Sequence, residues 1–310
     1  MAGSSRKVII AALAGNTLIA ITKFAAAAMT NSSAMLSEGI HSLVDTGNQI
    51  LLLYGLKRAQ QPASAMFPFG HGKEVYFWSF VVAILIFAVG AGVSLYEGIH
   101  RLLHPQPMVD VYINYIVLGL AIVFEGGAWL FAVKEFAKQK GKDSYFAAVQ
   151  HAKDPSMFVV LFEDSAALLG LAVALLAIFL GQITGNPYFD GIASIIIGLI
   201  LGGTAIWLAY ETKSLLIGER ANPATVEGIK AIVSGSEYIT HVNEVSTMHI
   251  GPEFVLVNIS LDIKDDVAAG SIKQIVTEQT KQIKQAYPLV KRVFIEFESR
   301  EKHTVGVVAE

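Results

Sequence analysis

Six apolar runs, each long enough to cross a lipid bilayer as a helix, constrain the fold of this chain more than any other feature. They occupy residues 8–29, 33–56, 76–99, 111–133, 156–181 and 188–210. About 20 mostly apolar residues span the hydrocarbon core as an α-helix, and only helices or closed barrels satisfy their own backbone there. The sequence therefore predicts a membrane α-helical bundle of six transmembrane helices, within residues 1–211.

Composition excludes several classes of function. The chain is 53% hydrophobic and contains no cysteine. It can therefore form neither a disulfide nor a thiolate metal site, and any metal would be held by His, Asp, Glu or Asn side chains. The net charge of −3 offers no basic surface of the kind that nucleic acid requires. We expect a lipid bilayer as a partner and no nucleic acid.

The Lys and Arg residues between the runs predict the orientation. One set of segments carries ten of them, and the opposite connections carry only Arg101; the ten are Arg6, Lys7, Lys57, Arg58, Lys73, Lys134, Lys138, Lys140, Lys142 and Lys153. Because cytoplasmic segments of membrane proteins are enriched in Lys and Arg, we expect both termini to be cytoplasmic. Residues 212–310 would then form a cytoplasmic domain.

The pattern changes after Tyr210 to one typical of a small α+β domain. Two amphipathic stretches alternate with three strand-like stretches, in the order α-β-β-α-β. About a hundred residues in this order suit a small sheet with two helices on one face. The stretches are ATVEGIKAIV (224–233), EVSTMHI (244–250), FVLVNISLDI (254–263), SIKQIVTEQTKQIKQAY (271–287) and VKRVFIEF (290–297).

Polar residues in two of the spans predict a metal site near the bilayer midplane. His41 and Asp45, four residues apart on one helix face, lie roughly 12 and 18 Å from the outer end of the second span. Asp164 lies roughly 14 Å into the fifth span, which enters from the other side with Asp154 as N-cap and Pro155 as first residue. An imidazole and carboxylates at one depth, without cysteine, indicate a divalent-cation site.

Other polar and small residues have simpler explanations. Glu38, Glu125 and Glu163 are lone intramembrane acids that could each pair with a neighbouring helix, where Lys23 and Asn16 are available. The spacing of Gly198 and Gly202, preceded by Gly191, is typical of close helix packing. His100 and His104 could form a weak metal entry site, although an ordinary interfacial pair is the simpler interpretation.

Several segments together resemble the cation diffusion facilitator family over nearly the whole chain. They are SEGIHSLVDTGNQ in the second span, PFGHGKEVYFWS before the third, NPYFDGIASIIIG at the start of the sixth, and the α-β-β-α-β tail. KDPSMFVVLFEDSAALLG together with ITGNPYFDG is most similar to the zinc transporter 9 branch. The resemblance implies a homodimer whose tail serves dimerisation or regulation.

The resemblance also implies a transport site built from two residue pairs, each four apart. His41 and Asp45 match the first pair and Asp164 matches one member of the second, but the remaining position is Val160. Glu163 borders the same helix face, so we hypothesise that it supplies the missing ligand. Two alternatives remain open: three ligands completed by water, or a Glu163 that pairs with another helix or shuttles protons.

Outside the transport site, the family's other functional positions are only partly matched. Of a second metal site in the loop between the second and third spans, His71 remains, with Phe67 where another ligand is expected. Lys73 matches a loop lysine that pairs with an acid near the start of the tail, for which Glu219 is the candidate. The resemblance would place the ligands of a dinuclear zinc site in the tail at four positions that carry no histidine here. We therefore expect no tight zinc pair there; the four residues are Asn243, Asn258, Glu296 and Glu298.

The function that the resemblance implies is proton-coupled antiport, in which a divalent cation, Zn²⁺ as first candidate, leaves the cytoplasm by alternating access. Ligands must be deprotonated to hold a metal, so His41, Asp45 and Asp164 would also carry the protons. We expect no enzyme activity, no prosthetic group, and a place in a prokaryotic inner membrane. The alternatives are a Mn²⁺, Fe²⁺ or Co²⁺ carrier of the same fold, or a metal-gated channel or sensor.

Overall fold

The computed structural model describes residues 2–140 and 153–300. The chain divides into two compact units, one formed by Met1–Gln60 with Glu74–Lys213 and the other by Gln61–Lys73 with Ser214–Glu310. The boundary near Lys213 lies close to the expected one after residue 211. The loop Gln61–Lys73 belongs to the second unit, although it interrupts the first unit in the sequence. Lys142, used above for orientation, lies outside the described residues.

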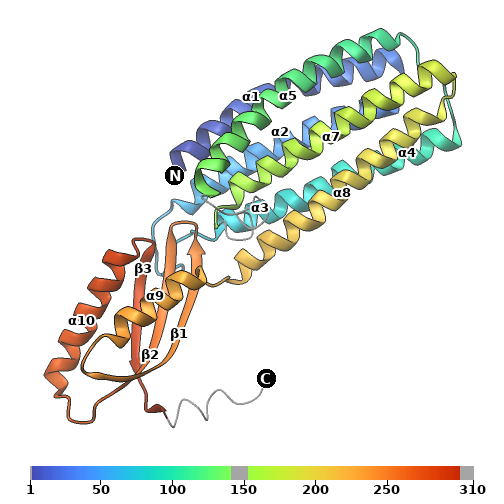
Figure 1. The fold of residues 1–310 in the computed structure, drawn as a ribbon. Coiled ribbons are helices and arrows are strands. Elements are labelled where there is room, and N and C mark those ends of the chain that lie inside the picture. Colours follow the sequence, from blue (N-terminus) through green and yellow to red (C-terminus); the bar gives the residue numbers. More distant parts are fainter. Residues whose placement is uncertain (1, 141–152, 301–310) are drawn as a thin grey trace. The chain divides into compact units, whose positions relative to one another are not determined.

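The first unit is a bundle of long helices, as predicted (Figure 1). A π-helical segment, Ile86–Ala91, joins α3 and α4 into one continuous helix, Glu74–Leu103. The other helices are separated by short connections or by the segment that is not described. The elements are α1 (Ala2–Thr30), α2 (Ser33–Ala59), α3 (Glu74–Leu85), α4 (Gly92–Leu103), α5 (Val111–Lys140), α7 (Pro155–Thr184) and α8 (Tyr188–Ile217).

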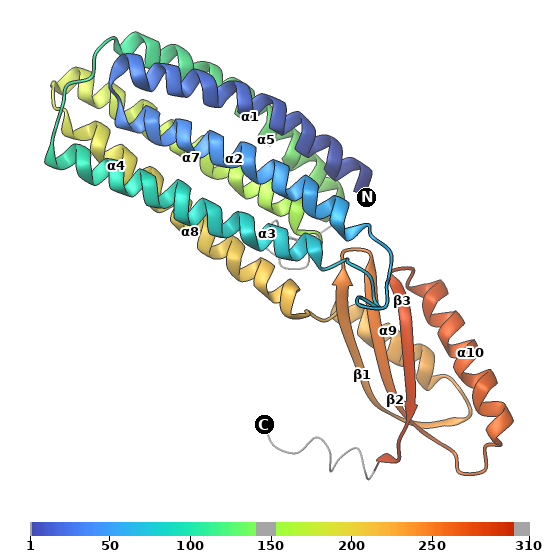
Figure 2. The same cartoon turned by 180° about the vertical axis from the view of Figure 1, so that it is seen from behind.

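Four helices of the described chain are long and apolar enough to cross a membrane: Glu74–Leu103, Val111–Ala137, Pro155–Thr184 and Tyr188–Ile217. The remaining two, α1 and α2, have 29 and 27 residues, which at about 1.5 Å per residue is also sufficient length. α1 and α2 run side by side in both views of the bundle (Figure 2). α2 is less apolar because it carries a series of buried polar side chains.

The start of α7 follows the sequence signals. Asp154 is its N-cap and accepts a hydrogen bond from the backbone N–H of Ser156 at 3.1 Å, and Pro155 occupies the first helical turn. The helix ends at Gly185, whose φ of 69° is one that glycine adopts without strain. Both expectations for the start of this helix are confirmed. They fix which residues of α7 lie deep in the bundle.

Glycines allow α4 and α8 to pack closely, as the Gly198 spacing predicted. A Cβ atom on Gly98 would lie 2.8 Å from the carbonyl oxygen of Gly191, and one on Gly198 would lie 2.8 Å from Leu95 Cγ. Real Cβ atoms do not approach other heavy atoms this closely. The helix-packing interpretation is therefore confirmed for Gly191 and Gly198, whereas a Cβ atom on Gly202 would make only an ordinary contact, 3.6 Å from Ala91 Cβ.

The second unit contains a three-stranded sheet, in the predicted order α-β-β-α-β. The strands lie side by side as β1-β2-β3, with β1 antiparallel and β3 parallel to β2. β1 begins five residues before the predicted strand, at Ile239 rather than residue 244. The elements are α9 (Pro223–Ser234), β1 (Ile239–Gly251), β2 (Phe254–Ile263), α10 (Ala269–Ala286) and β3 (Val290–Phe297).

One face of this sheet carries the core of the second unit. Alternate residues of β2 are buried, and residues from both helices pack against them. The core therefore contains residues of both helices and all three strands, including Ile229, Val233, Val242, Val255, Val257, Ile259, Leu261, Ile283 and Val290. The expected arrangement of two helices on one face of a small sheet is confirmed.

Candidate functional site

α2 brings His41 and Asp45 together. Their side chains are one helical turn apart, 2% and 5% exposed, and His41 Nε2 lies 2.9 Å from Asp45 Oδ2. The two groups are close enough to form an ion pair when His41 is protonated, and His41 Nδ1 has no hydrogen-bond partner among the described residues. A buried imidazole with a free Nδ1 beside a carboxylate offers ligand atoms to a cation.

Across from this pair, α7 contributes the adjacent acids Glu163 and Asp164, 3% and 8% exposed. Glu163 Oε1 accepts a hydrogen bond of 2.7 Å from Asn48 Nδ2 of α2, and Glu163 Oε2 has no hydrogen-bond partner among the described residues. Glu163 therefore faces α2, the helix of His41 and Asp45. Val160, at the position where the resemblance predicts a ligand, is also buried.

The structure brings the acids of the two helices into electrostatic range without forming a complete metal cluster. Asp45 is close enough to Glu163 and to Asp164 for their charges to interact. Within residues 2–140 and 153–300, however, no three His, Asp or Glu side chains are close enough together to hold one metal ion. Shared coordination by His41, Asp45, Asp164 and Glu163 stays a prediction.

Asn48 is a site residue that the sequence reasoning missed. It is fully buried and connects α2 to Glu163. Its position was a usable signal, because residues 41, 45 and 48 follow the i, i+4, i+7 spacing of one helix face. An uncharged amide in that series is less conspicuous than a charge in a lipid-spanning segment.

A second buried group surrounds Lys23 of α1, which is fully inaccessible to solvent. Its Nζ lies 2.9 Å from Glu38 Oε2, from Ser42 Oγ and from Glu125 Oε1. The expectation that lone acids pair with a neighbouring helix is thus confirmed for Glu38 and Glu125. Glu163 also pairs with a neighbouring helix, through Asn48 of α2 rather than through Lys23 or Asn16.

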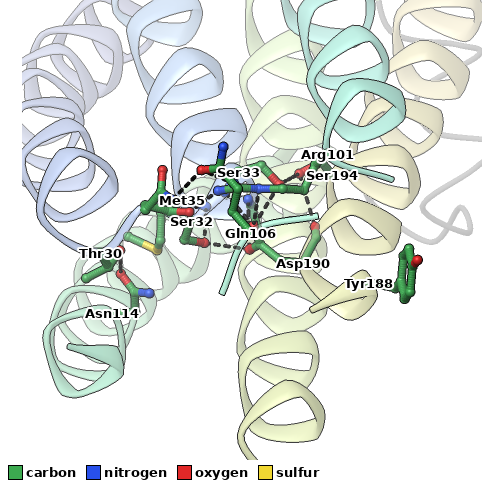
Figure 3. Close-up of polar contacts among 12 residues, drawn as sticks. Thr30, Ser32, Ser33, Met35, Arg101, Gln106, Asn114, Tyr188, Asp190 and Ser194 are labelled. Atoms are coloured by element: carbon green, nitrogen blue, oxygen red, sulfur yellow. Dashed lines mark hydrogen bonds and ion pairs between the residues drawn. The ribbon is translucent and has the colours of Figure 1, made fainter. Parts of the chain in front are cut away.

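The N-terminus of α2 is held by Asp190 of α8 (Figure 3). Asp190 Oδ2 accepts hydrogen bonds from Ser33 N at 2.6 Å and Ser33 Oγ at 2.8 Å, and Oδ1 accepts one from Ser32 Oγ at 2.6 Å. Arg101 Nε lies 3.4 Å from the same carboxylate. A carboxylate is stabilised at a helix N-terminus, so this contact fixes α2 against α8 and α4.

The sequence alone does not predict this contact. In the sequence Arg101 is only a charge that bears on orientation, whereas in the structure it is 6% exposed and also contacts the carbonyl oxygen of Asn31. Asp190 lies near the start of the last apolar run, and two serines precede α2. Only the tertiary arrangement makes them partners.

In the second unit, the loop residues singled out by the sequence have other neighbours. His71 packs against Phe67, with ring centroids 4.6 Å apart. Lys73 Nζ lies 3.3 Å from the carbonyl oxygen of Leu216 and 3.9 Å from Met248 Sδ. A pair between Lys73 and Glu219, and metal binding by His71, stay predictions.

The tail positions at which the resemblance would place zinc ligands form hydrogen bonds among themselves. Asn243 Nδ2 donates to the carbonyl oxygen of Glu298 at 2.8 Å, and Asn258 Nδ2 lies 3.3 Å from Glu296 Oε1. At the end of α4, the rings of His100 and His104 lie 4.9 Å apart. Neither arrangement identifies a metal ligand by itself.

Comparison with known proteins gives the family. The sequence model of the cation efflux transmembrane domain matches residues 9–217. The chain is 34% identical over 268 residues to the mitochondrial proton-coupled zinc antiporter SLC30A9 of Mus musculus, covering 86% of this chain and 47% of that protein. It is 29% identical over 250 residues to metal tolerance protein C4 of Arabidopsis thaliana, covering 80% and 55%.

A bacterial relative matches over nearly its full length. The manganese efflux system protein MneP of Bacillus subtilis is 24% identical over 296 residues, covering 94% of this chain and 95% of that protein. The chain spans only about half the length of the mouse and Arabidopsis relatives. The family model covers more than half of the chain, and the predicted likeness to the zinc transporter 9 branch is confirmed by the match to SLC30A9. The chain belongs to the cation efflux family, the cation diffusion facilitators.

Proposed function

We propose that the protein is a proton-coupled antiporter that exports divalent cations by alternating access, with Zn²⁺ as the first candidate. One observation carries this proposal: a buried His41–Asp45 pair on α2 lies within electrostatic range of a buried acid pair on α7. Relatives described as a zinc antiporter and as a manganese efflux protein support the same class of activity. The function involves no covalent chemistry, so the protein is not an enzyme.

The buried charges supply the coupling between metal and protons. Several acids in a low-dielectric interior are tolerated only when a cation or bound protons compensate them. A divalent cation requires deprotonated ligands, so its arrival releases protons and protonation expels it. His41, Asp45 and Asp164 would each act as ligand and as proton carrier. Alternating access would expose this one site to each side in turn.

Glu163 is the proposed fourth ligand in place of Val160. It faces α2, and its Oε2 atom has no hydrogen-bond partner among the described residues. Asn48 holds the other oxygen and would orient the carboxylate, as partners of metal ligands commonly do. The other two roles, a helix-pairing acid and a proton shuttle, make different predictions on substitution.

The chemistry of the proposed ligands narrows the transported metal to a few divalent ions. A site with three carboxylates and one imidazole is harder than a typical zinc site and suits Mn²⁺, Fe²⁺ or Co²⁺ better than one with two imidazoles. The MneP relative carries manganese in its name. A metal-gated channel or a membrane-tethered sensor is the candidate from another class, in which flux would not depend on a pH gradient.

The remaining parts of the proposal concern the whole protein. We infer a homodimer in a prokaryotic inner membrane, with both termini in the cytoplasm. The first unit would carry transport and the second dimerisation or regulation. The compact core of the second unit supports a separate role for it.

Transport into proteoliposomes tests this function. We would load purified full-length protein into vesicles with an internal pH dye and add Zn²⁺, Cd²⁺, Mn²⁺, Fe²⁺ or Co²⁺ with and without a pH gradient. An antiporter moves protons against each transported metal, and an imposed gradient drives metal accumulation. Metal flux that does not depend on the pH gradient would favour a channel, and metal binding without flux would favour a sensor.

A further inference from the structure

The Lys23 cluster, formed by Lys23, Glu38, Ser42 and Glu125, has more acceptors than its single cation can satisfy. A lysine ammonium has three N–H donors. All three are used, on Glu38 Oε2, Ser42 Oγ and Glu125 Oε1. The second oxygens, Glu38 Oε1 and Glu125 Oε2, are buried and have no hydrogen-bond partner among the described residues.

The cluster also has unbalanced charge. Two carboxylates and one ammonium sum to −1 in the interior of the bundle, where an uncompensated charge is strongly unfavourable. α7 lies directly against one of these oxygens, since a Cβ atom added to Gly170 of α7 would overlap Glu38 Oε1. One added proton would remove the net charge and give one of these oxygens a hydrogen to donate.

We propose that Glu38 and Glu125 share one proton, in addition to Lys23, when the metal site is empty, and that this proton leaves when a divalent cation binds. The step is a simple ionisation, in which a carboxylic acid becomes a carboxylate and the proton passes to water. The Lys23 cluster is thus a proton site that is separate from the metal ligands. Its release step rests on the proposed function; its resting protonation does not.

The charged groups around the cluster explain why metal and proton would compete. Glu125 of α5 interacts with Lys23 from α1, with Glu38 and His41 from α2, and with Asp164 from α7. Glu38 in turn acts on His41. A dication held near His41 and Asp164 would add positive potential at both carboxylates of the cluster. Because charges inside a protein are poorly screened, this potential favours the ionised acid.

A static ion cluster is the competing explanation. Lys23 joins helices α1, α2 and α5, and it would do so equally well if both acids were always ionised. That explanation predicts no protonated carboxyl group in the cluster and no response to metal. The two explanations therefore differ in a spectroscopic property of the resting protein.

Infrared difference spectroscopy on the purified full-length protein tests the resting proton. A protonated carboxylic acid has a C=O stretching band that a carboxylate lacks. We would compare wild type with Glu125→Gln and Glu38→Gln, each of which removes one acid but keeps an oxygen that can accept from Lys23. Glu97→Gln, a half-buried glutamate of α4, is the matched control. We expect both cluster variants, and not the control, to lose band intensity at neutral pH.

Zn²⁺ addition tests the release. In wild type and Glu97→Gln the band should weaken as Zn²⁺ binds, and proton release should be about one proton per metal larger than in Glu125→Gln or Glu38→Gln. Using both cluster variants guards against a folding defect in either one. If neither Glu125→Gln nor Glu38→Gln has a weaker band than wild type before Zn²⁺ is added, the proton site is overturned.

The two proposals fail in different ways. If metal binds and drives proton flux, but Glu125→Gln and Glu38→Gln release as many protons per metal as wild type, the cluster proposal is wrong and the antiport proposal stands. If wild type binds no metal, the proposed function and the release step are both overturned. The resting band would then still report whether the cluster holds a proton.

Discussion

The buried acids of the bundle meet different kinds of partner, and the kind of partner limits what an acid can do. Glu38 and Glu125 hold a permanent cation, Lys23, and so have little need of a metal. Asp45 lies beside His41, which is neutral or charged according to its proton. Glu163 contacts only an amide, Asn48, among its hydrogen-bond partners in the described chain. We therefore expect the acids that have no permanent cation beside them to be the ones that bind the transported cation.

Asp45 and Asp164 are therefore expected to be essential. Asp45→Ala or Asp164→Ala should each abolish Zn²⁺-driven proton flux in proteoliposomes, because loss of one ligand weakens the site and leaves the other acids uncompensated. The folded state, followed by size-exclusion chromatography, should persist. Glu97→Gln serves as the control with normal flux. Wild-type flux in either alanine variant would refute the site.

Glu163 can be tested by moving its role to the neighbouring position. Glu163→Gln should weaken metal binding at least tenfold, about 1.4 kcal/mol, while Asn48 can still hydrogen-bond the new side chain. Val160→His with Glu163→Gln should recover zinc affinity, because the imidazole then supplies the missing ligand. Isothermal titration of wild type, both single variants and the double variant measures this. Unchanged affinity in Glu163→Gln would assign the residue to proton transfer or helix pairing.

Lys23 should matter more for stability than any exposed cation. Lys23→Met leaves Glu38 and Glu125 buried without a counter-ion, which costs about 3–5 kcal/mol. Arg58→Met is the control, because Arg58 pairs with Glu74 at 3.0 Å with a side chain 36% exposed, and such a pair contributes at most about 1 kcal/mol. Thermal unfolding in detergent compares them. Equal losses of stability would contradict the central role of Lys23.

At the scale of elements, helix α2 is positioned from its end as well as along its length. Asp190 accepts hydrogen bonds from the first backbone N–H groups of α2, Ser33 N and Ala34 N, and is itself paired with Arg101. α2 carries His41 and Asp45 two to three turns further on. A shift of its N-terminus would therefore move both residues relative to α7.

Asp190→Asn tests this positioning. The amide keeps one acceptor oxygen but loses the charge that favours a helix N-terminus and Arg101, so we expect a destabilisation of about 1–3 kcal/mol and weaker metal binding. Thermal unfolding and metal titration measure the two effects. Asp110→Asn, at an exposed aspartate, is the matched control. Full stability and affinity in Asp190→Asn would show that the serine hydroxyls suffice to hold α2.

The elements also show what the sequence could and could not predict. Apolar length located every described helix of the bundle, and Asp154 with Pro155 located the start of α7, because these signals are local. The π-helical segment Ile86–Ala91 was not predicted, since one extra residue in a turn leaves an apolar run apolar. The contact of Asn48 with Glu163 was missed because it depends on which faces of two helices meet.

At the scale of the whole molecule, the chain combines two units that are stabilised by different interactions. The bundle is held in part by buried ion pairs and close glycine contacts, whereas the second unit has an ordinary apolar core under its sheet. The second unit also includes the loop Gln61–Lys73, where Gly72 lies against the backbone of Ile250 and Gly251. A unit with its own core is expected to fold without help from a membrane.

The isolated segment 212–310 should therefore fold and dimerise without metal. Its core residues Val257 and Ile283 are fully buried within the unit, and the positions at which the resemblance would place zinc ligands are Asn and Glu, which hydrogen-bond to each other. Circular dichroism and analytical ultracentrifugation in the presence of a chelator should give a folded dimer. Val257→Asp, which places a charge in the core, is the control that should unfold.

In titration calorimetry the segment should show no submicromolar zinc binding, because carboxylate and amide oxygens without imidazole or thiolate bind Zn²⁺ weakly. Tight zinc binding, or folding only with zinc, would contradict this and would give the second unit a metal-sensing role.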